Sequence, residues 1–237
     1  DETFFSSAIV FLKKLFEEIF EKEWIDTYKK NFEVSIFNIL QECALSINKD
    51  LAKAGLTIIQ NEFQNAEIET LVNCLSSIGR KIDQLTIPNA RLFLLIVEQF
   101  NEQSDESEDR FIDVVVKSIE ICQSKKLFVV WAQARSTLLK VLQKFNTDEN
   151  RQKDIAKTLQ ETLKIYVEND FLKKSEAQQS LAWNQSVVVS LQMLNNMKDD
   201  LFYLSFDESS DYLLQIIRTY SSEVRKQIST AMQRKLL

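Results

Sequence analysis

NKDLAKAGLTIIQNEF, residues 48–63, reads as one complete helix with its own start signal. Asn48 is a typical N-cap, because its side-chain oxygen can accept a hydrogen bond from a backbone N–H of the first turn. The residues expected to face inward recur at the 3.6-residue helical period: Leu51, Ala54, Gly55, Ile58 and Ile59. Ala52, Ala54 and Gly55 are small enough to let another helix approach closely. The stretch therefore predicts a helix over 49–63 that packs against a neighbour.

The same helical pattern extends over the rest of the chain. Among 237 residues there are only two Gly and one Pro, although turns depend on these residues for backbone conformations that others resist. Helices joined by short turns are expected at 3–22, 26–47, 49–63, 66–85, 89–100, 109–123, 125–145, 148–167, 175–197, 207–220 and 221–237. The sequence thus predicts an all-α protein of about eleven helices.

Three of these helices carry more specific expectations. The apolar stripe of the first is Phe5, Ala8, Ile9, Leu12, Leu15, Phe16 and Ile19. The inward residues of the second are Phe32, Ile36, Ile39, Leu40 and Cys43. Pro88 should occupy the first turn of the fifth, where its missing N–H is tolerated.

Helix length suggests how the helices associate. Two consecutive helices and their turns take about 40 residues, the period of HEAT and armadillo repeats. A four-helix bundle is the alternative, but it would not use eleven helices. We therefore predict an α-solenoid of antiparallel helix pairs over 1–237, with a subdivision at the polar segment 101–110.

The composition excludes several kinds of active site. The chain has no His, which removes Ser-His-Asp and Cys-His nucleophilic sites and every His-containing metal site. Gly55 and Gly79 are too far apart to form a phosphate-binding loop. We expect no cofactor and no catalysis, and an enzyme that relies on carboxylates alone is the remaining catalytic alternative.

Charge and cysteine content indicate the cellular setting. The net charge of −6 favours neither nucleic acid nor an anionic membrane. Cys43, Cys74 and Cys122 lack the spacing of a zinc site or a disulfide framework, so they are expected to be buried free thiols in the cytoplasm. No uncharged apolar run reaches the roughly 20 residues of a membrane span. Because the chain begins DETFF, without Met or a basic leader, it is interpreted as a piece of a longer protein.

The candidate binding residues lie on two segments. In 221–237, Ser221 or Ser222 is the expected N-cap, and the inward stripe is Val224, Ile228 and Ala231. This stripe should pack on the helix that contains Leu213, Leu214, Ile216 and Ile217. The residues expected to stay in solvent, where they could contact a protein, are Arg225, Lys226, Arg234 and Lys235. In 101–110, Asp105 and Glu106 are either a docking site for a basic partner or part of a solvated loop.

Residues 14–63 resemble the C-terminal helical region of large Golgi-type Arf guanine-nucleotide exchange factors. The likeness consists of a Leu-Phe-x-x-x-Phe helix (Leu15, Phe16 and Phe20), an apolar helix and the small-residue helix AKAGLTIIQNEF. It resumes at 113–142 and at the EVRKQI helix. The resemblance implies a regulatory region that binds small GTPases of the Arf or Rab type, with peripheral Golgi association through the parent protein. The exchange domain and its catalytic glutamate are absent from these residues.

Two protein-binding functions follow from this sequence. The first is a non-catalytic regulatory scaffold in Arf-dependent membrane traffic. The second is an assembly scaffold of karyopherin type that binds protein cargo. Trp24, Trp131 and Trp183 lie on separate predicted helices, which disfavours the Trp-Asn array typical of karyopherin repeats.

Overall fold

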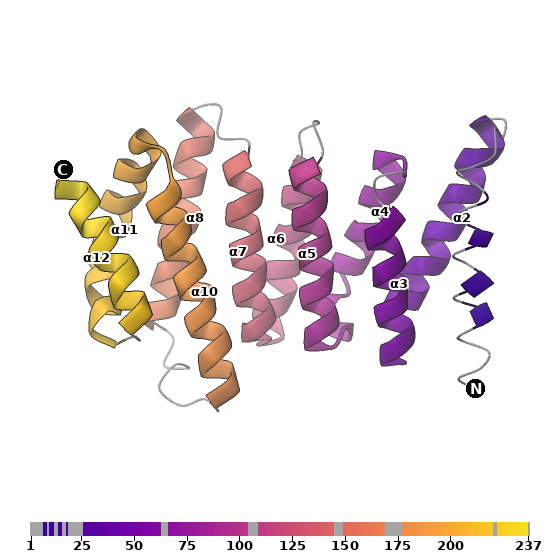
Figure 1. Ribbon diagram of the computed structural model, residues 1–237, viewed down its shortest axis with the longest axis horizontal. Helices are drawn as coiled ribbons and strands as arrows, with labels where there is room; N and C mark the ends of the chain where they lie inside the picture. The colour runs from indigo at the N-terminus through magenta and orange to yellow at the C-terminus, as the bar shows by residue number, and fades with distance from the viewer. Residues whose placement is uncertain are drawn as a thin grey trace. The chain divides into compact units, whose positions relative to one another are not determined.

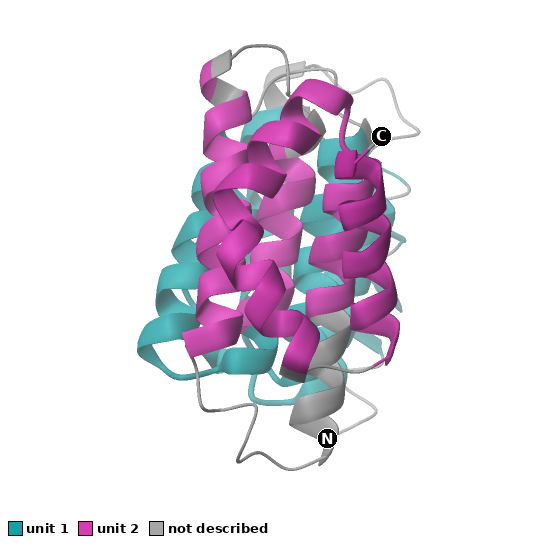
Figure 2. Ribbon diagram, turned by 90° about the vertical axis from the view of Figure 1, so that its left-hand side faces the viewer, with its two compact units in different colours: residues 1–130 teal, residues 131–237 magenta. Residues whose placement is uncertain are grey.

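The chain is almost entirely helical in the part that its structure describes (Figure 1). The computed structural model describes residues 7–8, 10–11, 14–15, 18, 26–62, 66–103, 109–144, 149–168, 177–219 and 222–236. Of these residues, 91% are in α-helices and none is in a strand. This confirms the all-α prediction. The chain divides into two compact units, residues 1–130 and 131–237 (Figure 2), and each is a solenoid-like stack.

Unit 1 arranges its helices in two rows. Its helices are α2 (Asp26–Ala44), α3 (Lys49–Glu62), α4 (Ile68–Gly79), α5 (Ile87–Gln103) and α6 (Asp109–Ser124), with a 3-10 turn η2 (Ile82–Gln84). α2 packs on α3 and α4, α3 packs on α5, and α4 packs on α6. One row is therefore α2, α4 and α6, and the other is α3 and α5, as Figure 1 shows. Contact with every second helix along the chain is the packing of a repeat solenoid.

Unit 2 repeats this arrangement with longer helices. α7 (Phe128–Lys144) begins in unit 1, and it is followed by α8 (Glu149–Glu168), α10 (Ala177–Asn196), α11 (Asp199–Thr219) and α12 (Ser222–Leu236). α11 packs along α8, while α12 packs on both α10 and α11. The boundary between the units falls inside α7, between Val130 and Trp131, and not in 101–110.

The α2–α3 pair forms for the reasons that its sequence suggests. The Asn48 side-chain oxygen accepts hydrogen bonds from the backbone N–H groups of Asp50 and Leu51, at 3.0 and 3.1 Å, so the predicted cap is confirmed. A Cβ atom added to Gly55 would lie 2.9 Å from Cys43 Cβ and 3.0 Å from the Ala44 backbone nitrogen. Only glycine lets the two helices come this close.

α2 buries a different face from the predicted one. Ile36 and Leu40 are buried as expected, but Phe32 and Ile39 are 40% and 47% exposed. Phe37 is buried in their place. The prediction for Phe32 and Ile39 was wrong because α2 has apolar residues over an arc wider than its two described neighbours cover.

α4 takes its N-terminal cap from another helix. The carboxylate of Glu33, which is buried on α2, accepts a hydrogen bond from the backbone N–H of Glu67. Glu67 is the N-cap residue of α4, and its own side chain makes no capping bond. The Glu33 charge also lies at the positive end of the α4 dipole.

Several predicted helix ends differ from the structure. α4 ends at Gly79, and η2 fills the predicted extension to residue 85. α5 begins at Ile87, two residues early, with Pro88 in its first turn as expected. α11 begins at Asp199 and not at residue 207, since Leu201 and Phe202 continue its buried face.

Another difference is the α6–α7 turn. Lys126 has a φ of 57°, a left-handed conformation that usually requires glycine. The N–H of Leu127 donates to the carbonyl of Cys122, and that of Lys126 to Gln123, which is the Schellman pattern of a helix end. α7 therefore begins at Phe128, three residues later than predicted.

The predicted helix over residues 3–22 lies mostly outside the described residues. Residues 7, 8, 10, 11, 14, 15 and 18 are described, and all are helical. Ala8 and Leu15, from the predicted stripe, are half-buried, whereas Val10 and Phe11 are exposed.

Candidate functional site

The inward stripe of α12 is confirmed. Val224, Ile228 and Ala231 are fully buried, and α12 packs on α11 as predicted. On α11, Leu213 and Ile216 are buried, as expected of the helix that receives the stripe, and Leu214 is 51% exposed. α12 also contacts α10, which the sequence analysis did not foresee.

Arg234 does not stay in solvent as predicted. Its guanidinium donates to the backbone carbonyls of Asn195 and Met197, each at 2.7 Å. It also donates to the Asp199 carboxylate at 2.6 Å and lies over the ring of Phe202, 4.0 Å from its centroid. Arg234 is a bound residue at the junction of α10 and α11.

Lys235 is bound in a similar way, one turn further along α11. Its ammonium pairs with the Asp207 carboxylate at 2.7 Å and lies 4.9 Å from the centroid of the Tyr203 ring. The Phe206 ring is 5.8 Å away. The prediction that Arg234 and Lys235 would be solvent-exposed was wrong, because both charges find carboxylates and aromatic faces on α11.

Arg225 and Lys226 remain the accessible basic residues of α12. Both are exposed, and neither forms an ion pair with another described side chain. Glu223, on the same turn, accepts a hydrogen bond from Gln227. Asp105 and Glu106, the acidic candidates, lie outside the described residues.

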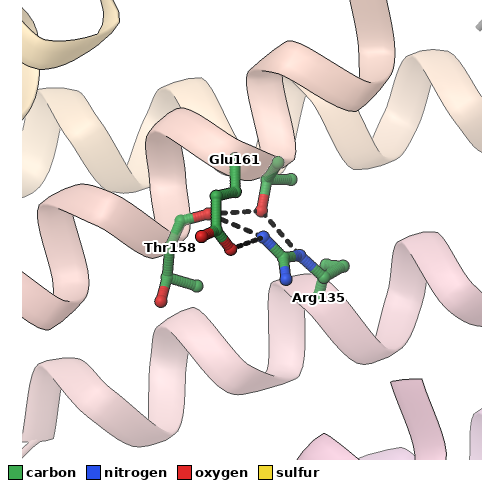
Figure 3. Close-up of polar contacts among 4 residues, drawn as sticks. Arg135, Thr158 and Glu161 are labelled. Atoms are coloured by element: carbon green, nitrogen blue, oxygen red, sulfur yellow. Dashed lines mark hydrogen bonds and ion pairs between the residues drawn. The ribbon is translucent and has the colours of Figure 1, made fainter. Parts of the chain in front are cut away.

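Arg135 of α7 is a buried charge that the sequence analysis missed (Figure 3). Its guanidinium donates to the Thr162 hydroxyl at 2.9 Å and to the Thr158 carbonyl at 3.0 Å, and pairs with Glu161 at 3.5 Å. Burial lowers the pKa of Arg135, and the Glu161 carboxylate opposes that shift. The ring of Trp131 lies 5.8 Å from the guanidinium carbon.

This cluster holds α7 against α8. Its three polar partners all come from α8, and Glu161 is half-exposed. The available signal was an arginine within VVWAQARSTLLKVL, residues 129–142, which is a largely apolar run. The geometry is that of a structural anchor.

A groove lies beside the turn between α2 and α3. Its volume is about 560 Å³, and its wall includes Ile39, Glu42, Cys43 and Ile47. Burial and then the neighbouring Glu42 carboxylate raise the pKa of the half-buried Cys43 thiol. The lining combines apolar side chains with the Glu42 carboxylate and the polar side chains of Asn38 and Ser46.

The other two thiols are buried, as predicted. Burial raises the pKa of Cys74 to about 12. The pKa of Cys122 is likewise raised to about 12, by burial and by Asp83. All three cysteines are free, and the expectation of full burial fails only for Cys43.

The described residues contain neither a metal-binding cluster nor a membrane-spanning helix. No group of three or more His, Cys, Asp or Glu side chains in them is placed to hold a metal ion. None of their helices combines the length and apolarity needed to cross a membrane. Comparison with protein-family models and with curated proteins gives no match.

Proposed function

We propose that this chain is a non-catalytic helical-repeat scaffold whose function is to bind other proteins. The support is its architecture, since each unit stacks its helices in two rows. Such stacks present long side-chain surfaces to solvent, and repeat proteins use them for binding. The partners that the sequence resemblance implies are small GTPases of the Arf or Rab type, in Golgi membrane traffic.

The observation that carries a specific site is the division of charge on α12. Arg234 and Lys235 are neutralised by Asp199 and Asp207, whereas Arg225 and Lys226 are exposed. The accessible positive charge of α12 is therefore concentrated in its first turns. We infer that this pair contacts an acidic surface of the partner.

The test is charge reversal of this pair. Arg225→Glu with Lys226→Glu should weaken binding to GTP-loaded Arf or Rab proteins by roughly tenfold at low salt, because complementary charge across an interface raises the association rate. Exposed reversals should leave folding within about 0.5 kcal/mol. Binding is measured by biolayer interferometry against a panel of GTPases in both nucleotide states.

The matched control reverses Lys53 and Arg91, which are exposed in unit 1, and changes the net charge equally. If both double variants lose the same binding affinity, the effect comes from net charge alone, and Arg225 and Lys226 are not the binding site. Absence of binding to every GTPase tested would reject the proposed partner class.

A regulatory region without catalytic activity predicts a second result. The purified chain should not accelerate GDP release from Arf, because the residues that resemble exchange factors come from their regulatory region. The measurement is release of a fluorescent GDP analogue with and without the chain. Any rate increase that scales with chain concentration would contradict the proposal.

A further inference from the structure

The junction of α10 and α11 is built as an arginine-binding site. Helix ends leave their last carbonyls without intrahelical partners. The Asn195 and Met197 carbonyls, at the end of α10, accept two N–H groups of the Arg234 guanidinium. Asp199 and Phe202, from the first turn of α11, supply a carboxylate and a ring face. A lysine ammonium cannot donate in this planar, forked geometry.

α11 extends the recognition to a second cation. Asp199, Tyr203 and Asp207 are spaced four residues apart, so they lie along one side of the helix. Tyr203 and Asp207 contact the Lys235 ammonium. The surface thus binds two consecutive cationic residues, an Arg followed by a Lys.

The rest of the surface packs against an apolar stripe of α12. Val224, Ile228 and Ala231, at i, i+4 and i+7, are the three fully buried residues of α12. Gln227 adds a directional contact, since the Asn195 side chain donates to both its carbonyl and its side-chain oxygen. Apolar residues at i, i+4 and i+7 followed by Arg-Lys at i+10 and i+11 define the ligand pattern.

The contacts of α12 are those of a helix that can dissociate from the α10–α11 surface. Two of its three buried side chains are no larger than Val. The Asp199 and Asp207 side chains are 79% and 63% exposed, so water and salt screen their ion pairs. α8 packs on α11 through a separate and more extensive contact, which does not require α12.

We propose that the α10–α11 surface is a binding site for an amphipathic helix of a partner protein with this pattern, and that α12 is its resident, displaceable occupant. In this chain α12 packs on α10 and α11 (Figure 1). The partner helix replaces α12 by presenting the same stripe and the same Arg-Lys pair. This site is separate from Arg225 and Lys226, so it does not depend on the proposed function.

The test uses the full chain and a labelled peptide with the sequence of residues 222–237, SEVRKQISTAMQRKLL. While α12 is docked, the apparent affinity of the peptide is reduced by the fraction of chains whose site is open. Two chain variants weaken α12 docking: Ile228→Ala removes apolar contact, and Arg234→Ala removes the guanidinium. Fluorescence anisotropy gives the peptide affinity for each.

Both variants should bind the peptide at least tenfold more tightly than the wild-type chain. Against the Ile228→Ala chain, a peptide with the Arg234→Ala or Arg234→Lys change should lose at least tenfold in affinity. The matched peptide with Arg225→Ala, which loses the same charge, should bind within twofold of the unmodified one. Thermal melts verify that each chain still unfolds cooperatively.

Three results would overturn the proposal. The first is no peptide binding to either folded variant. The second is equal weakening by the Arg225 and Arg234 changes, which would indicate unspecific attraction to acidic residues. The third is a wild-type dimer that the peptide converts to a monomer, since the occupant would then be a second copy of this chain.

Discussion

Gly55→Ala measures how closely α2 and α3 are packed. In a helix interior, replacing Gly by Ala normally stabilises by about 1 kcal/mol through helix propensity. Here the new methyl group would lie 2.9 Å from Cys43 Cβ, 3.0 Å from the Ala44 nitrogen and 3.1 Å from the Leu40 carbonyl oxygen. Carbon atoms prefer roughly 3.5–4.0 Å, and two of these three neighbours are backbone atoms that cannot rotate away.

The helices must therefore separate, and overpacking of this kind costs about 1–3 kcal/mol. Since the propensity gain of about 1 kcal/mol offsets part of it, we expect a net loss of up to about 2 kcal/mol, or a fall in Tm of up to roughly 4–8 °C in a chain of this length. Calorimetry measures the loss, and hydrogen exchange should localise it to the amides of α2 and α3.

Gly79→Ala is the matched comparison. Its nearest neighbours are all side-chain atoms, with Ser118 Oγ at 3.0 Å and Val114 and Phe93 at 3.3 and 3.4 Å. Side chains can shift, so the loss should be under about 1 kcal/mol. A Gly55→Ala chain at least as stable as the wild type, or one less affected than Gly79→Ala, would refute this account of the α2–α3 contact.

Three further predictions concern the candidate residues. Ile228→Asp should destabilise α12 by roughly 2–4 kcal/mol, because it places an unpaired carboxylate in the contact; unchanged exchange of the α12 amides would contradict this. Arg135→Ala should cost about 2–4 kcal/mol through loss of a buried hydrogen-bonded cation, whereas Arg135→Met should cost less; urea denaturation compares them, and equal losses would count against the anchor. At pH 8 a thiol reagent should modify Cys43 first, since a pKa of about 12 for Cys74 and Cys122 leaves roughly one thiolate in ten thousand; three equally fast thiols would disprove the burial.

Local signals in the sequence were enough to predict most of the helices, and the lengths of those helices predicted the solenoid-like stacking. These signals concern only one or two helical turns at a time. They are the Asn48 cap, the absence of helix-breaking Gly and Pro from most segments, and the spacing of Val224 and Ile228. The start of α7 could not be predicted, because the turn before it contains Lys126 in a left-handed conformation without the glycine that normally signals such a turn.

The candidate site was harder to predict than the fold. Arg234 looked like an exposed cation, because its acceptors at Asn195, Met197 and Asp199 are more than 30 residues away in the sequence. For α2, periodicity identified apolar residues correctly, but it could not decide between Phe32 and Phe37 for the core. That choice depends on where the neighbouring helices lie.

The cap that α2 supplies to α4 has a consequence for the order of folding. The first turn of α4 lacks a side-chain cap of its own, and the Glu33 carboxylate that binds the Glu67 N–H comes from 34 residues earlier. Until α2 docks, this turn should fray, since isolated helices of this length are marginal in water. The two helices should therefore nucleate together, which couples adjacent repeats kinetically. In a refolding experiment, Glu33→Gln should slow the appearance of α4 protection without delaying α5.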